Sequence, residues 1–141
     1  MYRVLMPVDG NEDRALAQAE YVASLPDAPD SVEVILLYVF VESDEDLPDE
    51  LEAFSRSVDR IASVRRAREY LEEQGVAVEL NEGSVDAAEN ILAEAEGRDV
   101  DAIVLGGRKR SPAGKALFGS VTQSVILKAD RPVMVAGDRD D

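Results

Sequence analysis

Cysteine and histidine are both absent from the 141 residues. The absence of cysteine excludes disulfides, thiol nucleophiles and thiolate metal sites, and the absence of histidine removes the usual general base and the commonest metal ligand. Enzymatic chemistry in this chain would have to use carboxylates or hydroxyls. We therefore predict no catalytic residues and no metal site.

Long hydrophobic runs are also absent, since no stretch reaches the roughly eighteen apolar residues that a membrane helix needs. The N-terminal "MYRVLMPVDG" has neither a charged leader nor a small-residue cleavage site. These features predict a cytoplasmic protein that does not contact membranes. The length and a hydrophobic content of 45% predict one domain over residues 1–141.

Positive charge is scarce, because 30 acidic residues face only 15 basic ones and the formal net charge is −15. Such a charge repels nucleic acid and anionic lipid, so we predict no nucleic-acid partner. Lysine contributes only Lys109, Lys115 and Lys128. An acidic, lysine-poor surface is typical of proteins adapted to high salt, where screening weakens self-repulsion. We favour this halophilic interpretation over that of an ordinary acidic protein.

Apolar patterning predicts strands that alternate with helices. The expected strands lie at 2–8, 32–40, 76–80, 101–107 and 131–137, and the expected helices at 14–25, 54–74, 85–97 and 120–128. Gly75 and Gly97 are predicted to end two of the helices and Ser84 to cap one. Because each parallel strand needs a crossover, this alternation predicts an α/β protein: an open parallel five-stranded sheet with helices on both faces. Ligands of such sheets bind beyond the carboxyl ends of the strands.

One segment has the opposite charge balance, since no acidic residue occurs between Ala102 and Ala129. A Walker phosphate loop does not fit it, because Lys109 stands at the first glycine position and Ala116 at the hydroxyl position. No G-x-G-x-x-G follows the first strand either. What remains is Gly106 at the end of a strand, a basic loop, and a Gly-Ser pair at 119–120 that opens a helix.

This arrangement resembles the universal stress protein family, whose nucleotide-binding members carry G-x-x-G-x9-G-[ST] at this place. The resemblance spans nearly the whole chain, from "VLMPVDG" and "ILLYV" through "NEGS" and "IVLGG" to "LFGSVTQSVI" and "RPVMVA". It implies a Rossmann-like sheet of strand order 3-2-1-4-5 and a regulatory stress module that binds adenine nucleotide. ATP, with or without Mg²⁺, is the implied ligand, and a homodimer paired through strand 132–136 is the implied assembly.

The candidate nucleotide-binding residues combine the positions matched to the family with the cations of the loop. They are Pro7, Val8, Asp9, Val39, Gly106, Lys109, Arg110, Gly119, Ser120 and Val121. A helix N-terminus offers free amide donors, and glycine lets the backbone approach a phosphate closely. We therefore expect the acid-free segment to bind an anion, most simply a nucleotide phosphate.

Three alternatives stay open at this point. Lys109 occupies the family's middle glycine position, so its side chain can fill the phosphate site and leave a nucleotide-free protein-interaction module. A slow ATP hydrolase using Asp9 with Mg²⁺ is a second alternative. The third alternative is purely structural. Ser120 and Gln123 would form a capping box, and Gly106 and Gly119 would only allow close packing. Asp9 would make a turn, and the basic residues of the loop would only balance the acidic charge.

Overall fold

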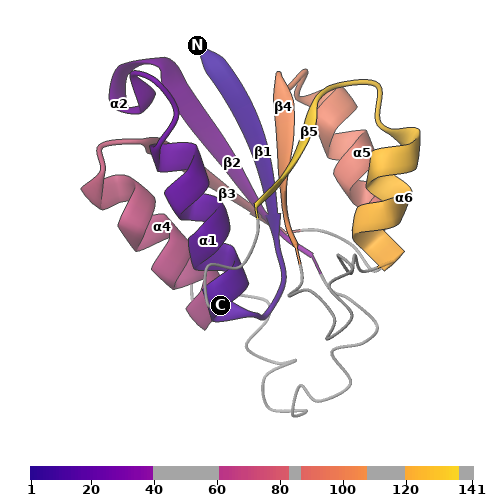
Figure 1. Ribbon diagram of the computed structural model, residues 1–141, viewed down its shortest axis with the longest axis horizontal. Helices are drawn as coiled ribbons and strands as arrows, with labels where there is room; N and C mark the ends of the chain where they lie inside the picture. Colours follow the sequence, from indigo (N-terminus) through magenta and orange to yellow (C-terminus); the bar gives the residue numbers. More distant parts are fainter. Residues whose placement is uncertain (40–60, 83–86, 108–119, 137–141) are drawn as a thin grey trace, which may run out of the picture.

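The fold is described by a computed structural model covering residues 1–39, 61–82, 87–107 and 120–136 (Figure 1). All strand pairs are parallel, and the sheet has the order β3-β2-β1-β4-β5, which confirms the predicted topology. The strands are β1 Tyr2–Val8, β2 Val32–Tyr38, β3 Ala77–Glu82, β4 Ala102–Gly106 and β5 Val133–Ala136.

Helices cover both faces of this sheet, as predicted. In Figure 1, α1 (Glu12–Ala23) and α4 (Ala62–Glu73) lie on one side, and α5 (Ala87–Gly97) and α6 (Ser120–Lys128) lie on the other. A one-turn helix, α2 (Ala28–Ser31), precedes β2 in a segment where the sequence indicates only a break. In the parts of the chain that the structure describes, no helix has the length and apolar character needed to cross a bilayer.

Each face has its own hydrophobic core, and alternate residues of the central strands feed the two cores. Val4, Met6 and Val8 of β1 pack in the α1–α4 core, whereas Leu5 packs in the α5–α6 core. Residues of β1 and β2 are therefore buried on both sides, which is why these strands are almost continuously apolar.

Helix ends follow the local sequence signals where those signals are strong. The Asn11 side chain caps α1 by accepting a hydrogen bond from the Arg14 amide at 2.9 Å, within the turn-forming "DGNED". Gly75 follows α4 with φ of 81°, and α5 ends at Gly97, as both glycines predict.

The predicted helix over 54–74 is not continuous at Ile61. This residue is the N-cap of α4, with extended backbone at φ −75° and ψ 126°, and α4 begins at Ala62. An apolar residue in register with a helical stripe can equally precede the first turn, so periodicity alone did not locate this boundary. Residues 54–60 and the predicted cap Ser84 lie outside the described residues.

The central strand β1 pairs unequally with its two neighbours. Its register with β2 extends over the whole strand, from Tyr2 opposite Val32 to Val8 opposite Tyr38. Its register with β4 covers only Val4 and Leu5. Pro7 has no amide proton to donate to a ladder. The sheet therefore loses β1–β4 pairing toward the carboxyl ends of these two strands.

Candidate functional site

The strand order reverses between β1 and β4, and in open α/β sheets this switch point is where ligands bind. Pro7 and Val8 end β1, Asp9 follows it, and Gly106 is the last residue of β4. Val39 follows β2, and its amide donates to the Val8 carbonyl at 2.9 Å. The structure thus brings these five predicted residues to one edge of the sheet.

Gln18 joins the two strands where their own pairing ends. Its side chain is 1% exposed, and its Nε2 donates to the Pro7 carbonyl at 2.7 Å and to the Val104 carbonyl at 3.0 Å. The α1 residue thus bridges β1 and β4 beneath the carboxyl-end edge. Sequence reasoning missed Gln18, although a polar residue inside the apolar stripe of Ala15, Ala19 and Val22 was a usable signal.

Asp9 is held by three neighbours. One carboxylate oxygen accepts from the Asn11 amide at 2.9 Å, which makes a turn, and the other accepts from Arg14 Nη1 at 2.5 Å. The backbone carbonyl of Asp9 accepts from the hydroxyl of buried Ser63 at 2.7 Å. The Asp9 and Arg14 side chains are only 22% and 23% exposed, so this ion pair is partly shielded from water.

Gly106 lies directly beneath the Arg14 side chain. A Cβ atom built on Gly106 would come within 2.6 Å of Arg14 Cδ and closer still to Cγ, and it would lie 3.1 Å from Gln18 Oε1. The absence of a side chain at Gly106 therefore makes room for the aliphatic part of Arg14. The Arg14 side chain thus spans the switch point, from the end of β4 to the carboxylate that follows β1.

The remaining candidates belong to the basic segment and the helix after it. Ser120 is the first residue of α6, and Val121 is half-buried against the α5–α6 core. Because α6 follows β4, its N-terminus points to the carboxyl-end edge, where amide groups and the helix dipole favour an anion. Lys109, Arg110 and Gly119 lie outside the described residues. Within the described ranges, no group of three or more His, Cys, Asp or Glu residues is arranged to hold a metal ion.

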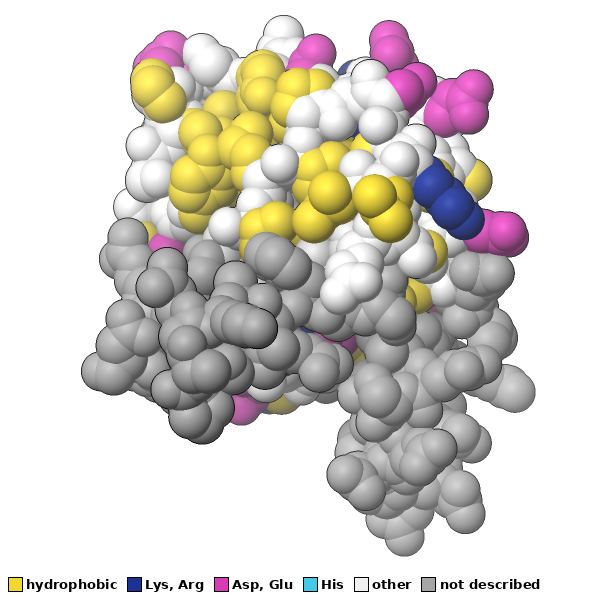
Figure 2. All heavy atoms as spheres, turned by 45° about the vertical axis from the view of Figure 1, so that its right-hand side comes forward, with side chains coloured by type: hydrophobic (Ala, Val, Ile, Leu, Met, Phe, Trp, Pro, Cys, Tyr) yellow, Lys and Arg dark blue, Asp and Glu magenta, His cyan; other side chains and the backbone are white. Residues whose placement is uncertain are grey.

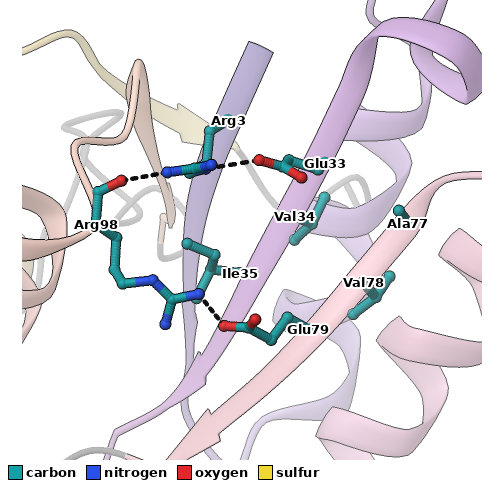
Figure 3. Close-up of a pocket in the computed structure, with 8 residues that line it drawn as sticks. All are labelled: Arg3, Glu33, Val34, Ile35, Ala77, Val78, Glu79 and Arg98. Atoms are coloured by element: carbon teal, nitrogen blue, oxygen red, sulfur yellow. Dashed lines mark hydrogen bonds and ion pairs between the residues drawn. The ribbon is translucent and has the colours of Figure 1, made fainter. Parts of the chain in front are cut away.

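A second hollow, of about 280 Å³, lies near the amino ends of β1, β2 and β3 (Figure 3). Its charged groups satisfy one another: Arg3 pairs with Glu33 at 2.6 Å and Arg98 pairs with Glu79. The hydrogen bond to Glu33 raises the pKa of the Arg3 guanidinium above its ordinary value. Since these charges are paired and the hollow is far from the switch point, we do not assign it a ligand.

The parallel sheet of order β3-β2-β1-β4-β5, with helices on both faces, defines a Rossmann-like α/β fold. The family model of the universal stress proteins matches residues 1–137. The chain therefore belongs to the universal stress protein family.

Two curated proteins match about half of this chain in sequence. A universal stress protein of Mycolicibacterium smegmatis is 36% identical over 76 residues, which cover 53% of this chain and 58% of the relative. The stress response protein NhaX of Bacillus subtilis is 33% identical over 72 residues, covering 51% of this chain and 43% of that protein. The matched stretch thus spans about half the length of each curated relative.

Solved structures of universal stress proteins superpose on almost the whole of this chain. A universal stress protein from Archaeoglobus fulgidus superposes with a TM-score of 0.70 at 28% identity, covering 96% of this chain and 98% of that one. A universal stress protein from the same organism in complex with dAMP has a TM-score of 0.67 at 24% identity, covering 96% and 97%. At that identity, the second likeness demonstrates the fold alone.

Proposed function

We propose that the chain is a regulatory stress-response module that binds an adenine nucleotide in the crevice between β1 and β4. The observation that carries this proposal is the cluster of Asp9, Arg14 and Gly106 between the carboxyl ends of β1 and β4. It combines a carboxylate, a guanidinium and a glycine backbone at the point where the strand order reverses. The dAMP complex of the archaeal protein supports the capacity of this fold to accept an adenine nucleotide.

The chemistry of the crevice fits such a ligand. In this proposal, Asp9 would accept hydrogen bonds from ribose hydroxyls or pair with a nucleotide-bound cation, and the backbone at Val39 would lie against the adenine ring. Phosphate would lie against Gly106 and the α6 N-terminus formed by Ser120 and Val121. Lys109, Arg110 and Gly119, which lie between β4 and α6 in the sequence, are the remaining residues of the proposed site.

The nucleotide proposal is tested by calorimetric titration of ATP, with Mg²⁺, into protein stripped of ligand by unfolding and refolding. Molar KCl is the right solvent, since a net charge of −15 makes the fold sensitive to screening. We expect saturable binding, weakened about tenfold or more in Gly119→Val, because a branched side chain keeps phosphate away from the helix N-terminus.

Gly97→Val is the matched control for this experiment. A Cβ at Gly97 meets no atom within 4 Å, and the residue lies at the end of α5. We expect it to leave ATP binding unchanged. Equal losses in both variants would contradict a phosphate site at Gly119, and absence of binding by folded wild-type protein would remove the nucleotide proposal.

The nucleotide-free interaction module is the alternative that Lys109 raises, and Lys109→Gly separates it from the main proposal. If the lysine side chain closes the phosphate site, ATP binds only to the variant. If Lys109 contacts phosphate, the variant binds ATP more weakly than the wild type does. Halophily and cytoplasmic location remain predictions from composition.

We further propose a homodimer paired through β5. The carbonyls of Pro132 and Ala136 accept hydrogen bonds from β4, so by strand alternation the amides of Val133 and Val135 face the open edge. The Val133–Ala136 edge carries no charge, whereas β3 at the other edge carries Glu79 and Glu82. Charged edge strands resist pairing and apolar ones invite it.

An exposed apolar patch on α6 is the alternative to β5 as the surface through which two copies of the chain could pair. Hydrophobic side chains gather on the side of the molecule shown in Figure 2, and Ile126 and Leu127 are 42% and 83% exposed. Replacing Leu127 therefore provides a comparison for replacing a residue of the β5 edge.

For Val135→Pro we expect the mass measured by light scattering after gel filtration to fall from dimer to monomer. Proline removes an outward amide while leaving the β4 ladder bonds in place. Circular dichroism checks that the variant is folded. Leu127→Ser should stay dimeric, and the reverse pattern would move the interface from β5 to α6.

A further inference from the structure

Arg14 is the residue of the crevice that the family pattern does not account for. Its guanidinium is bound to Asp9 at 2.5 Å, and its aliphatic carbons lie over Gly106. Any ligand that approaches the Gly106 backbone must therefore displace these carbons. Moving them shifts the guanidinium relative to Asp9, because the same side chain makes both contacts.

Moving the Arg14 guanidinium away from Asp9 has an electrostatic cost that only some ligands can offset. The Asp9 carboxylate would keep the Asn11 amide as a donor but lose its cationic partner in a partly buried place. The guanidinium would likewise lose its carboxylate. A neutral nucleoside offers hydroxyl donors to Asp9 but nothing anionic to Arg14, whereas a nucleotide offers hydroxyls together with phosphate oxygens.

We propose that Arg14 is a specificity-determining residue that exchanges Asp9 for a ligand phosphate and so selects nucleotides over nucleosides. This inference rests on the proposed nucleotide site and adds to it a mechanism of selection. Guanidinium suits the exchange because carboxylate and phosphate both match its planar set of donors. In this structure, the Arg14 side chain lies over Gly106 while its guanidinium is paired with Asp9.

The test compares ATP with adenosine by calorimetry in wild type, Arg14→Gln and Arg14→Lys. We expect Arg14→Gln to bind ATP about tenfold more weakly, the size of a lost charge-assisted hydrogen bond, and to bind adenosine as well as or better than wild type. Arg14→Lys keeps the charge and should retain part of the preference for ATP.

Arg68→Gln is the matched control, because Arg68 also pairs with a carboxylate, Glu72 at 3.2 Å, but on the exposed surface of α4. It should leave both affinities unchanged. An unaltered ratio of ATP to adenosine affinity in Arg14→Gln, with both ligands binding, overturns the role of Arg14 while the nucleotide site stands. Failure of all variants and of wild type to bind either ligand overturns the site and the role together.

Discussion

Replacing Gln18 by leucine is expected to lower the free energy of unfolding by about 2–4 kcal/mol. The Gln18 amide is buried and donates to two strand carbonyls, those of Pro7 and Val104. Leucine keeps a similar volume but leaves both oxygens without this donor, and an unsatisfied buried polar group costs about 1–3 kcal/mol. Urea denaturation of wild type and variant, monitored by circular dichroism, measures the difference.

Gln74→Leu is the control for Gln18→Leu, since it makes the same chemical change at an exposed position after α4. We expect it to change stability by less than about 0.5 kcal/mol. If the proposed nucleotide site is correct, the Gln18 variant should also weaken ATP binding, because β1 and β4 lose the bridge between the carbonyls of Pro7 and Val104. A Gln18→Leu protein as stable as the Gln74→Leu protein would show that the two carbonyls do not depend on this donor.

The architecture was predictable because the signals that specify it are local and repeated. The apolar runs of β1 and β2 alternate with helical stripes, and only a parallel sheet covered on both faces buries both kinds of segment. Gly75 and Gly97 both marked helix ends, and at Gly75 the positive φ of 81° requires the conformational freedom of glycine. Ile61 was wrongly assigned to a helix because it continues the apolar stripe, although its backbone is extended.

The contents of the crevice were only partly predictable. Asp9 and Gly106 were predicted as site residues from a family pattern, and the order of the strands places them at one edge of the sheet. Arg14 and Gln18 were missed because their roles depend on contacts with residues far along the chain: Gln18 bonds to Val104, 86 positions away. Single-sequence periodicity treats Arg14 as a solvent-facing helix residue and cannot detect the glycine beneath it.

A double-mutant cycle on Gly106 and Arg14 should give a coupling energy of about 1–2 kcal/mol. Gly106→Ala alone is expected to cost about 1–3 kcal/mol, because the new methyl group overlaps the Arg14 side chain and forces it off Asp9. Arg14→Ala alone should cost about 1 kcal/mol, the value of a partly exposed ion pair and some packing.

With Arg14 already shortened, the alanine at position 106 meets only Gln18 Oε1 at 3.1 Å, which moves aside by a few tenths of an ångström. The double variant should therefore be nearly as stable as Arg14→Ala, as read from urea denaturation of all four proteins. Simple additivity would mean that the backbone at position 106, and not Arg14, requires glycine. A positive coupling instead establishes that position 106 requires glycine because the Arg14 side chain lies over it.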